Sequence, residues 1–236
     1  MITAIHQPNF IPWLGFFHKI RCSDIFVVLD DVQFPKQGGN WINRVRINAS
    51  GSPRWLTVPV YRPAGLQTIR EVRTHESSWA EEHMRILELH YRDAPYFADV
   101  RGVIEEIFAE RVDSLLEFNM RAIVLLLDVL GKDEKEKLVL SSSLEVTSSG
   151  TRRLVDLVRG SGSSSYMCGM GSAGYLDSAE FESASISLVM QEFVEENRPQ
   201  LRAGEFLRGL SIVDALFMVG INGTNEIIDR ACRKEQ

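Results

Sequence analysis

The sequence predicts an α/β fold: a Rossmann-like, mostly parallel sheet with flanking helices, a β-hairpin insertion and a helical middle section. Three observations lead to this prediction. The chain opens with strand, helix and strand patterns, a long stretch of helical periodicity follows a turn-rich hairpin pattern, and strand and helix patterns then alternate again. With 236 residues the chain can bury a large core, and we predict a single domain over residues 1–236.

The N-terminal residues predict a βαβ unit. Residues 2–5 are a short apolar run that ends in a proline turn, and residues 25–29 are typical of a strand buried on both faces. Between them, Pro12 precedes apolar residues at helical spacing. Because strands joined in this way are parallel neighbours, His6 and Asp30 should emerge together at the carboxyl edge of the sheet, where open α/β folds bind ligands.

A β-hairpin is predicted next. Residues 44–48 alternate polar and apolar side chains, residues 55–60 resume an extended pattern, and a turn-rich segment joins them. The alternation places Arg44 and Arg46 on one face of the hairpin. A planar guanidinium binds phosphate or carboxylate through two hydrogen bonds, so this face is a candidate anion site.

Helices and a second α/β half complete the predicted fold. Residues 79–130 have helical periodicity with two interruptions, and the pattern stops at Gly131, as expected of a glycine C-cap. Ser211 is a predicted N-cap, with Asp214 at the third helical position in an acidic variant of the capping box. The other expected elements are strands at residues 138–140, 166–168 and 186–190 and a helix at residues 151–160.

Composition narrows the class of protein. The net charge of −6 disfavours a nucleic-acid binder with a basic face. The first 62 residues carry a charge of +4 and the remainder −10, which favours an anionic small ligand, with scattered surface charge as the alternative. No segment has the pattern of a signal peptide or the apolar length of a membrane span, so we expect a cytoplasmic protein.

The three cysteines, Cys22, Cys168 and Cys232, are isolated, odd in number and without CxxC spacing. This pattern argues against a disulfide framework and against a zinc site made of cysteines. We therefore predict that they are small buried residues with free thiols.

Polar residues at the predicted sheet edge carry the candidate chemistry. His6 titrates near neutrality, so it can act as a general acid or base or donate to a phosphate oxygen, and the alternative is a structural histidine in a turn. Asp30 and Asp31 can bind a ribose hydroxyl, ligate a magnesium–phosphate complex or orient the histidine. Turn formation is the competing role for both aspartates.

The loop before the hairpin and a late glycine-rich segment add candidates. Asn43 offers a donor and an acceptor to a hydroxylated ligand beside Arg44. Trp13 and Trp41 can stack on a sugar or base ring, although core packing is their more common role. Residues 169–174 resemble a phosphate-binding loop but lack the Lys-Ser/Thr pair of a P-loop. The absence of HExxH, GxSxG and Cys/His metal spacing argues against zinc and serine hydrolases.

Several separated motifs, taken in order, resemble the WbqC-like protein family. They are AIHQPNFIPWLGFFHKI, SDIFVVLDDVQF, the Asn-Arg pair in NWINRVRI, WLTVPV, SYMCGMGSAGYLDSAEFESASISL, RPQLRAGEF and LSIVDALFMVG. The resemblance extends over essentially the whole chain. It implies a role in bacterial surface-polysaccharide (O-antigen) biosynthesis, as a transferase that acts on a nucleotide-linked sugar or glycan precursor and adds a glycyl or other acyl group.

The motif positions of this resemblance give the candidate site residues. Catalytic roles are assigned to His6, Asp30, Asp31 and Asp214, and substrate-binding roles to Gln7, Gln33, Asn43, Arg44, Gln200 and Ser211, with no metal ligand among them. The chain departs from the family's pattern at two places: Arg198 stands where a tyrosine is usual, and Gly38-Gly39 lengthens the loop before Trp41. The resemblance therefore gives less direct support for substrate contacts near Arg198 and for the shape of the loop before Trp41.

Two other functions stay open at this point. The N-terminal unit is similar to the start of HIGH-type nucleotidyltransferases and pantothenate-synthetase-like ligases, without their HxGH spacing, which makes an ATP-using enzyme with a nucleotide and Mg²⁺ an alternative. A non-catalytic binding or scaffold protein of a polysaccharide assembly complex is another, and it predicts that the polar motif residues do not converge on one pocket. The expected partner is an anionic small molecule such as a sugar nucleotide, not nucleic acid, and the oligomeric state is not predicted.

Overall fold

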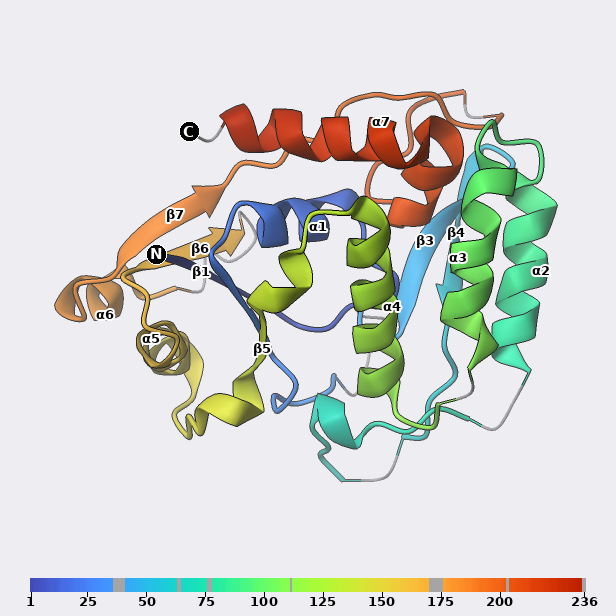
Figure 1. Cartoon of the computed structure of the whole chain (residues 1–236). Coiled ribbons are helices and arrows are strands. Elements are labelled where there is room, and N and C mark those ends of the chain that lie inside the picture. The colour runs from blue at the N-terminus through green and yellow to red at the C-terminus, as the bar shows by residue number, and fades with distance from the viewer. Residues whose placement is uncertain are drawn as a thin grey trace.

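A five-stranded parallel sheet forms the centre of the structure (Figure 1), which confirms the predicted α/β fold. The computed structural model describes residues 1–35, 41–62, 65–75, 78–110, 112–169, 176–202 and 204–234. The strand order is β5-β2-β1-β6-β7. The strands are β1 (Ile2–His6), β2 (Ile25–Val28), β5 (Leu138–Leu140), β6 (Ser165–Gly169) and β7 (Ser187–Gln191).

The chain starts in the middle of this sheet and fills it outward in both directions. From β1 it passes through α1 (Leu14–Arg21) to β2, which lies parallel to β1 with His6 opposite Val28, so the predicted βαβ unit is confirmed. The chain later adds β5 at one edge and then β6 on the other side of β1. Since the direction of strand addition reverses between β1 and β6, the topological switch point of the sheet lies there.

Helices cover both faces of the sheet (Figure 1). One face carries α1, α4 (Leu115–Leu130) and α7 (Ile212–Lys234), and the other carries α5 (Gly150–Gly160) and α6 (Ser178–Ser183). Successive strand residues alternate between them: Ala4 belongs to the core under α1 and α7, and Ile5 to the core under α5. No helix in the described part of the chain is both long and apolar enough to cross a membrane.

The predicted hairpin and helical middle section are confirmed. The hairpin pairs β3 (Arg44–Ala49) with antiparallel β4 (Ser52–Thr57), and α2 (Trp79–Tyr91) and α3 (Phe97–Ala109) precede α4. α4 ends at Gly131, whose φ of 66° lies in the left-handed region that glycine adopts without strain. Three short 3₁₀ helices complete the described elements: η1 (Ile69–Glu71), η2 (Glu134–Lys137) and η3 (Ser141–Leu144).

The last helix differs from its predicted capping. Ser211 Oγ accepts the Val213 N–H at 3.3 Å, as an N-cap does, but the capping box is incomplete. The Ser211 N–H donates to the Arg46 carbonyl instead, and Asp214 turns to other partners. α7 is also kinked at Gly220, where a Cβ would lie 2.8 Å from the ring of Tyr96.

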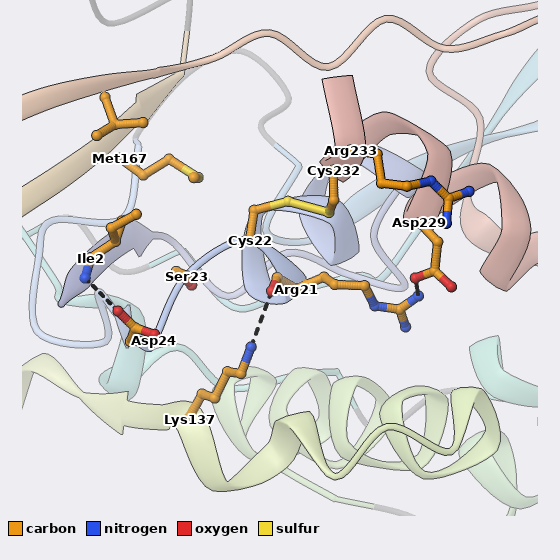
Figure 2. Close-up of a pocket in the computed structure, with 11 residues that line it drawn as sticks. Ile2, Arg21, Cys22, Ser23, Asp24, Lys137, Met167, Asp229, Cys232 and Arg233 are labelled. Carbon is orange, nitrogen blue, oxygen red and sulfur yellow. Dashed lines mark hydrogen bonds and ion pairs between the residues drawn. A yellow bond between two sulfur atoms is a disulfide. The ribbon is translucent and has the colours of Figure 1, made fainter. Parts of the chain in front are cut away.

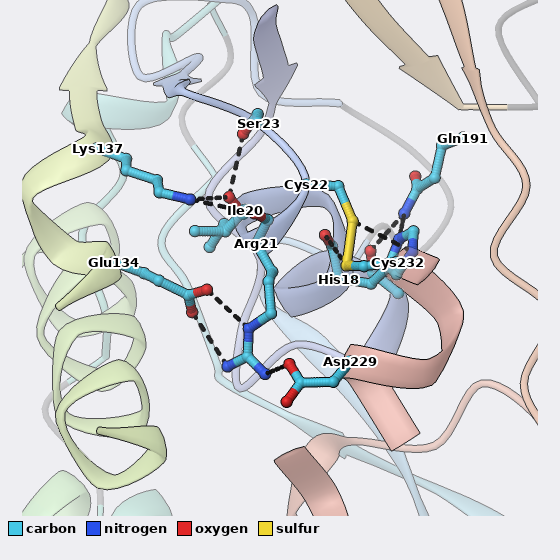
Figure 3. Close-up of a disulfide and its surroundings, with 11 residues drawn as sticks. His18, Ile20, Arg21, Cys22, Ser23, Glu134, Lys137, Gln191, Asp229 and Cys232 are labelled. Carbon is cyan, nitrogen blue, oxygen red and sulfur yellow. Dashed lines mark hydrogen bonds and ion pairs between the residues drawn. A yellow bond between two sulfur atoms is a disulfide. The ribbon is translucent and has the colours of Figure 1, made fainter. Parts of the chain in front are cut away.

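The prediction of three free cysteines is wrong for two of them. Cys22 and Cys232 form a disulfide that joins the end of α1 to the end of α7, with their Cα atoms 6.0 Å apart (Figure 3). Cys168 is buried and free, as predicted. The paired cysteines are 210 positions apart in the sequence, which leaves no local signal, and the packing of α1 against α7 brings them together.

Candidate functional site

A lysine is buried at the topological switch point, close to the carboxyl end of β1. Lys19 in the last turn of α1 is 4% exposed, and its Nζ donates to the Ile5 carbonyl at 3.4 Å. A helical side chain leans toward the N-terminus of its helix, which lets Lys19 reach back from the last turn of α1 to the end of β1. The side chain thus places a cation where open α/β sheets bind ligands.

The ammonium group of Lys19 is poorly compensated by the protein. Among the described residues its one hydrogen-bond partner is the Ile5 carbonyl, at a long distance, and no carboxylate lies within ion-pair distance. Burial lowers the pKa of Lys19 to about 8, because the charged form loses solvation. A buried cation without a counter-ion is costly, and a bound anion would supply the missing partner.

His6, the last residue of β1, is a neutral imidazole. Burial lowers its pKa to about 4, and the nearby charge of Lys19 adds to this effect, while a hydrogen bond to Gln7 opposes it. That bond joins His6 Nδ1 to the Gln7 carbonyl at 2.9 Å. Since a carbonyl only accepts, Nδ1 carries the proton and Nε2 keeps its lone pair. The ring is held edge to face against Trp13 and Phe16, with centroids 5.7 and 5.2 Å away.

A line of indole rings extends from the N-cap of α1 to the hairpin. Trp13, Trp41 and Trp55 follow one another with centroids 5.1 and 5.3 Å apart, and all three are at least partly exposed. The Arg44 guanidinium lies 4.0 Å from the centre of the Trp55 ring, and the Arg46 guanidinium lies 5.4 Å from that of Trp41. We call these five residues the tryptophan strip.

The backbone near α7 fixes the position of Arg46 in the strip. Its Nη2 donates to the Arg208 carbonyl at 3.1 Å. The next residue, Gly209, has a φ of +65°, and a Cβ there would lie 2.8 Å from Arg46 Nη2. Exposed aromatic rings next to guanidinium groups suit a ligand that combines a sugar or base with a phosphate, since the rings stack and the cations bind the anion.

Asp30 and Asp31 follow β2 and bind residues at the end of β5 and in α5. Asp30 is buried, and its carboxylate accepts hydrogen bonds from Ser141 Oγ, Ser142 N and Ser142 Oγ at 3.0, 2.9 and 2.7 Å. Arg153 Nη2 lies 2.6 Å from Asp31 Oδ1. Although partial burial opposes it, hydrogen bonds from Ser141 and Arg153 lower the pKa of Asp31. Protein donors contact both oxygens of Asp30, which agrees with the alternative role of turn formation.

Asp214 and Gln200 belong to a buried polar network at the start of α7. The Asp214 carboxylate accepts hydrogen bonds from Tyr91 Oη at 2.9 Å, Arg198 Nη2 at 2.8 Å and Gln200 Nε2 at 3.3 Å. Arg198 Nη1 also binds Glu195 at 3.0 Å. Burial raises the pKa of Asp214, and the charge of Arg198 opposes this rise. These residues pair with one another, as a structural network does, except that Arg198 Nε is buried without a hydrogen-bond partner among the described residues.

Three predicted residues remain: Ser211, Asn43 and Gln33. Ser211 Oγ donates to the Ile11 carbonyl at 2.8 Å. Asn43 is buried and its Nδ2 donates to the Val58 carbonyl at 3.0 Å, whereas Gln33 is exposed. The structure therefore brings His6 and Gln7 together at the switch point, with Arg44 on the strip. Asp30, Asp31, Asn43, Gln200, Ser211 and Asp214 form hydrogen bonds with other protein groups, and Ser211 adjoins the strip because its N–H donates to the Arg46 carbonyl. The proposed phosphate loop and the lengthened loop at Gly38-Gly39 lie outside the described residues, at 170–174 and 36–40.

Comparison with known proteins gives the family. The sequence model of the WbqC-like protein family matches residues 7–226. The chain belongs to the WbqC-like protein family. A relative from Mycobacterium tuberculosis, the uncharacterized protein Rv1507c, is 32% identical over 234 residues, which are 98% of this chain and 99% of the relative. No solved structure matches this WbqC-like chain. The matched range begins at Gln7 and includes Lys19, the tryptophan strip and the Asp214 network.

Two residues of this WbqC-like site were missed in the sequence. Lys19 follows Phe16 by three residues, so it lies on the apolar face of α1, and a lysine on an apolar helix face is the signal that would have identified it. Arg46 was placed on the same hairpin face as Arg44 but was not selected as a site residue. Its link to the start of α7 comes from a contact across more than half of the chain, which the sequence does not show.

Proposed function

We propose that the protein is a transferase of surface-polysaccharide biosynthesis that acts on a nucleotide-linked sugar or a related anionic glycan precursor. The observation that carries this proposal is the buried ammonium of Lys19 at the switch point, which has no carboxylate partner among the described residues. Open α/β sheets bind ligands at this point. A phosphate group there would supply the charge that the protein itself does not provide.

The tryptophan strip supports a ligand that is larger than a phosphate. Trp55 is 39% exposed, and stacking of a base on an aromatic ring is worth about 1–3 kcal/mol. Arg44 and Arg46 bring two further cations to these rings. In our proposal Lys19 and the arginines bind the diphosphate, and the rings bind the apolar faces of the sugar or the base.

His6 supplies the proton-accepting group in the proposed reaction. When a hydroxyl or amine of the acceptor attacks the carbonyl carbon of an acyl or glycyl donor, a new C–O or C–N bond forms and the donor's leaving group departs with its bonding electrons. The attacking group must lose a proton, and the unprotonated Nε2 of His6 accepts it. Lys19 stabilises the negative charge that develops. Asp30, Asp31 and Asp214 act by positioning their neighbours.

Calorimetric titration with UDP, a UDP-sugar, uridine and the free sugar tests the ligand site. We expect UDP and the UDP-sugar to bind and the two uncharged molecules not to bind. Lys19→Met should weaken UDP binding at least about 10-fold, since a hydrogen bond to a charged group is worth about 1.5–3 kcal/mol. Lys135→Met is the matched control, because Lys135 is exposed and already paired with Asp128. Equal affinity of the wild type and Lys19→Met for UDP would contradict the proposal.

A non-catalytic binding protein of a polysaccharide assembly complex is the second candidate function. It is supported by the hydrogen bonds that Asp30, Asn43 and Asp214 form with other protein groups, although Asn43 Oδ1 is buried and has no hydrogen-bond partner among the described residues. Both functions use the same ligand site and differ in turnover. Incubation of the UDP-sugar with acyl and glycyl donors, followed by mass spectrometry, separates them. Turnover that His6→Gln abolishes while UDP binding persists supports the transferase, and ligand binding without turnover supports the binding protein. ATP-dependent release of pyrophosphate would indicate a ligase instead.

A further inference from the structure

A cavity of about 510 Å³ opens at the amino edge of the sheet, and its lining includes no residue of the proposed site (Figure 2). It lies next to the first residue of β1 and the loop between α1 and β2. Both partners of the disulfide, Cys22 and Cys232, line its wall, and both residues are partly exposed. The volume is sufficient for a small molecule, so the disulfide borders a space that a ligand can enter.

The wall of this cavity carries charges of both signs (Figure 2). Arg21, Lys137 and Arg233 contribute positive charge, and Asp24 and Asp229 contribute negative charge, with Arg21 Nη1 2.7 Å from Asp229 Oδ1. Lys137 Nζ donates only to backbone carbonyls, including that of Arg21 at 3.2 Å, so no acidic side chain within ion-pair distance neutralises it in the described structure. A zwitterion with a carboxylate and an ammonium group matches this wall better than an apolar molecule does.

His18 contacts the disulfide from its buried side (Figure 3). Its Nε2 lies 3.5 Å from Cys22 Sγ, and its Nδ1 lies 3.0 Å from Gln191 Nε2, which also donates to the Gly15 carbonyl at 2.7 Å. Because an amide nitrogen only donates, Nδ1 accepts and Nε2 carries the proton. His18 therefore holds an N–H group 3.5 Å from Cys22 Sγ, and the Ala231 backbone also hydrogen-bonds this ring. His18, Cys22 and Cys232 are close enough to hold a metal, but ligation through Nε2 would need a lone pair there.

We propose that Cys22–Cys232 is an exchangeable disulfide that a zwitterionic, low-molecular-weight thiol attacks from the cavity. The thiolate of the small molecule forms a bond to Cys232 Sγ while the bond between the two cysteines breaks. The electron pair leaves on Cys22 Sγ as a thiolate, which the His18 N–H stabilises, and a stabilised thiolate leaves faster. The product is a mixed disulfide at Cys232 and a thiol at Cys22, and no oxidant is consumed because exchange conserves the oxidation state. Exchange opens the covalent link between α1 and α7.

Intact-mass spectrometry of the protein purified without reductant tests this site, with reduced glutathione as the probe. Thiol titration after unfolding should first detect one free thiol per chain, Cys168. Glutathione should then add once to the native protein, and peptide mapping should locate it on Cys232. The rate should exceed that with uncharged 2-mercaptoethanol, compared at equal thiolate concentration, by several-fold. Cys168→Ala is the matched control and should give the same adduct.

Two variants separate the contributions of His18 and of the cavity charges. His18→Gln should slow the formation of the adduct with both thiols, because the leaving thiolate loses its hydrogen-bond donor. Arg233→Ala changes an exposed residue and should slow the reaction with glutathione but not with 2-mercaptoethanol. Three free thiols in the purified protein, an adduct at Cys168, or an adduct that forms only in denaturant would overturn the proposal.

Discussion

Two buried cations, Arg198 and Lys19, are treated differently by this protein. The Arg198 side chain is 3% exposed and lies 3.0 and 2.8 Å from the carboxylates of Glu195 and Asp214. Lys19 is equally buried but has one long hydrogen bond to a carbonyl. Burial of either charge costs solvation free energy. The two residues differ in their partners, because two carboxylates compensate Arg198 and none within ion-pair distance compensates Lys19 among the described residues. Arg198 completes a structural network, whereas Lys19 leaves a charge that a ligand can complete.

The largest expected effect is a loss of stability when the network of Arg198, Glu195 and Asp214 is broken. Arg198→Met should destabilise the protein by about 3–5 kcal/mol, because it leaves Glu195 and Asp214 buried without their cation. Urea unfolding at pH 7 measures this loss. Arg202→Ala is the control: its ion pair with Asp93 is more than half exposed, so its removal should cost no more than about 1 kcal/mol. Similar losses in the two variants would show that the network contributes little.

Replacement of Lys19 by methionine should change the free energy of unfolding in the opposite direction. Lys19→Met removes a buried charge with no ion-pair partner among the described residues, and we expect it to stabilise the protein by about 1–3 kcal/mol at pH 7. The measurement is again urea unfolding, with the UDP titration of the same variant beside it. A gain in stability together with a loss of affinity would show that Lys19 is maintained for binding. A destabilisation like that of Arg198→Met would show that its charge is already compensated in the protein.

The stability difference between the wild type and Lys19→Met should depend on pH. The folded pKa of Lys19, about 8, lies below the unfolded value of 10.5, so the unfolded chain binds more protons between these values. The wild type therefore gains stability relative to the variant as the pH rises from 8 to 10.5, and the difference is largest below pH 8. Unfolding curves at pH 7, 9 and 10 measure this trend. A difference that does not change with pH would assign the effect to packing.

The regular elements of the fold were predictable because their signals are local. The apolar run of residues 2–5, the helical spacing after Pro12 and the glycine that ends α4 each act within one or two turns of chain. The switch point was not predicted, because it depends on β6 pairing with the free side of β1. That pairing joins residues more than 160 positions apart, and no local pattern contains it.

The candidate site was predictable only in part, for the same reason. The residue types at His6 and Arg44 and their positions at element ends already pointed to the sheet edge and the hairpin face. The partners of Asp214 could not be predicted in this way, since Tyr91 lies 123 residues away in the chain. Asp214 has the same residue type whether it contacts a substrate or completes a network. The donors that contact its carboxylate are known only from the structure.

Removal of one ring tests the part of the site that lies farthest from Lys19 along the strip. Trp55→Ala should weaken binding of UDP or the UDP-sugar by about 1–3 kcal/mol if a base or sugar stacks there. It should change the free energy of unfolding less than a core substitution would, because Trp55 is 39% exposed. Tyr61→Ala, a 50% exposed ring outside the strip, is the control. Unchanged affinity in Trp55→Ala would confine the ligand to the region of Lys19 and His6.

The smallest expected effect concerns Ser211, a predicted binding residue whose hydroxyl already has hydrogen-bond partners in the protein. Ser211 Oγ accepts the Val213 N–H and donates to the Ile11 carbonyl, so Ser211→Ala should cost about 0.5–2 kcal/mol of stability, as the loss of an N-cap does. UDP affinity should not change, and Ser211→Thr, which keeps the hydroxyl, should recover most of the lost stability. Unfolding and titration of both variants separate a capping role from a binding role. A loss of UDP affinity in Ser211→Ala at unchanged stability would show that the Ser211 hydroxyl binds the ligand although it has protein partners. Hydrogen-bond satisfaction would then not distinguish structural from functional residues in this protein.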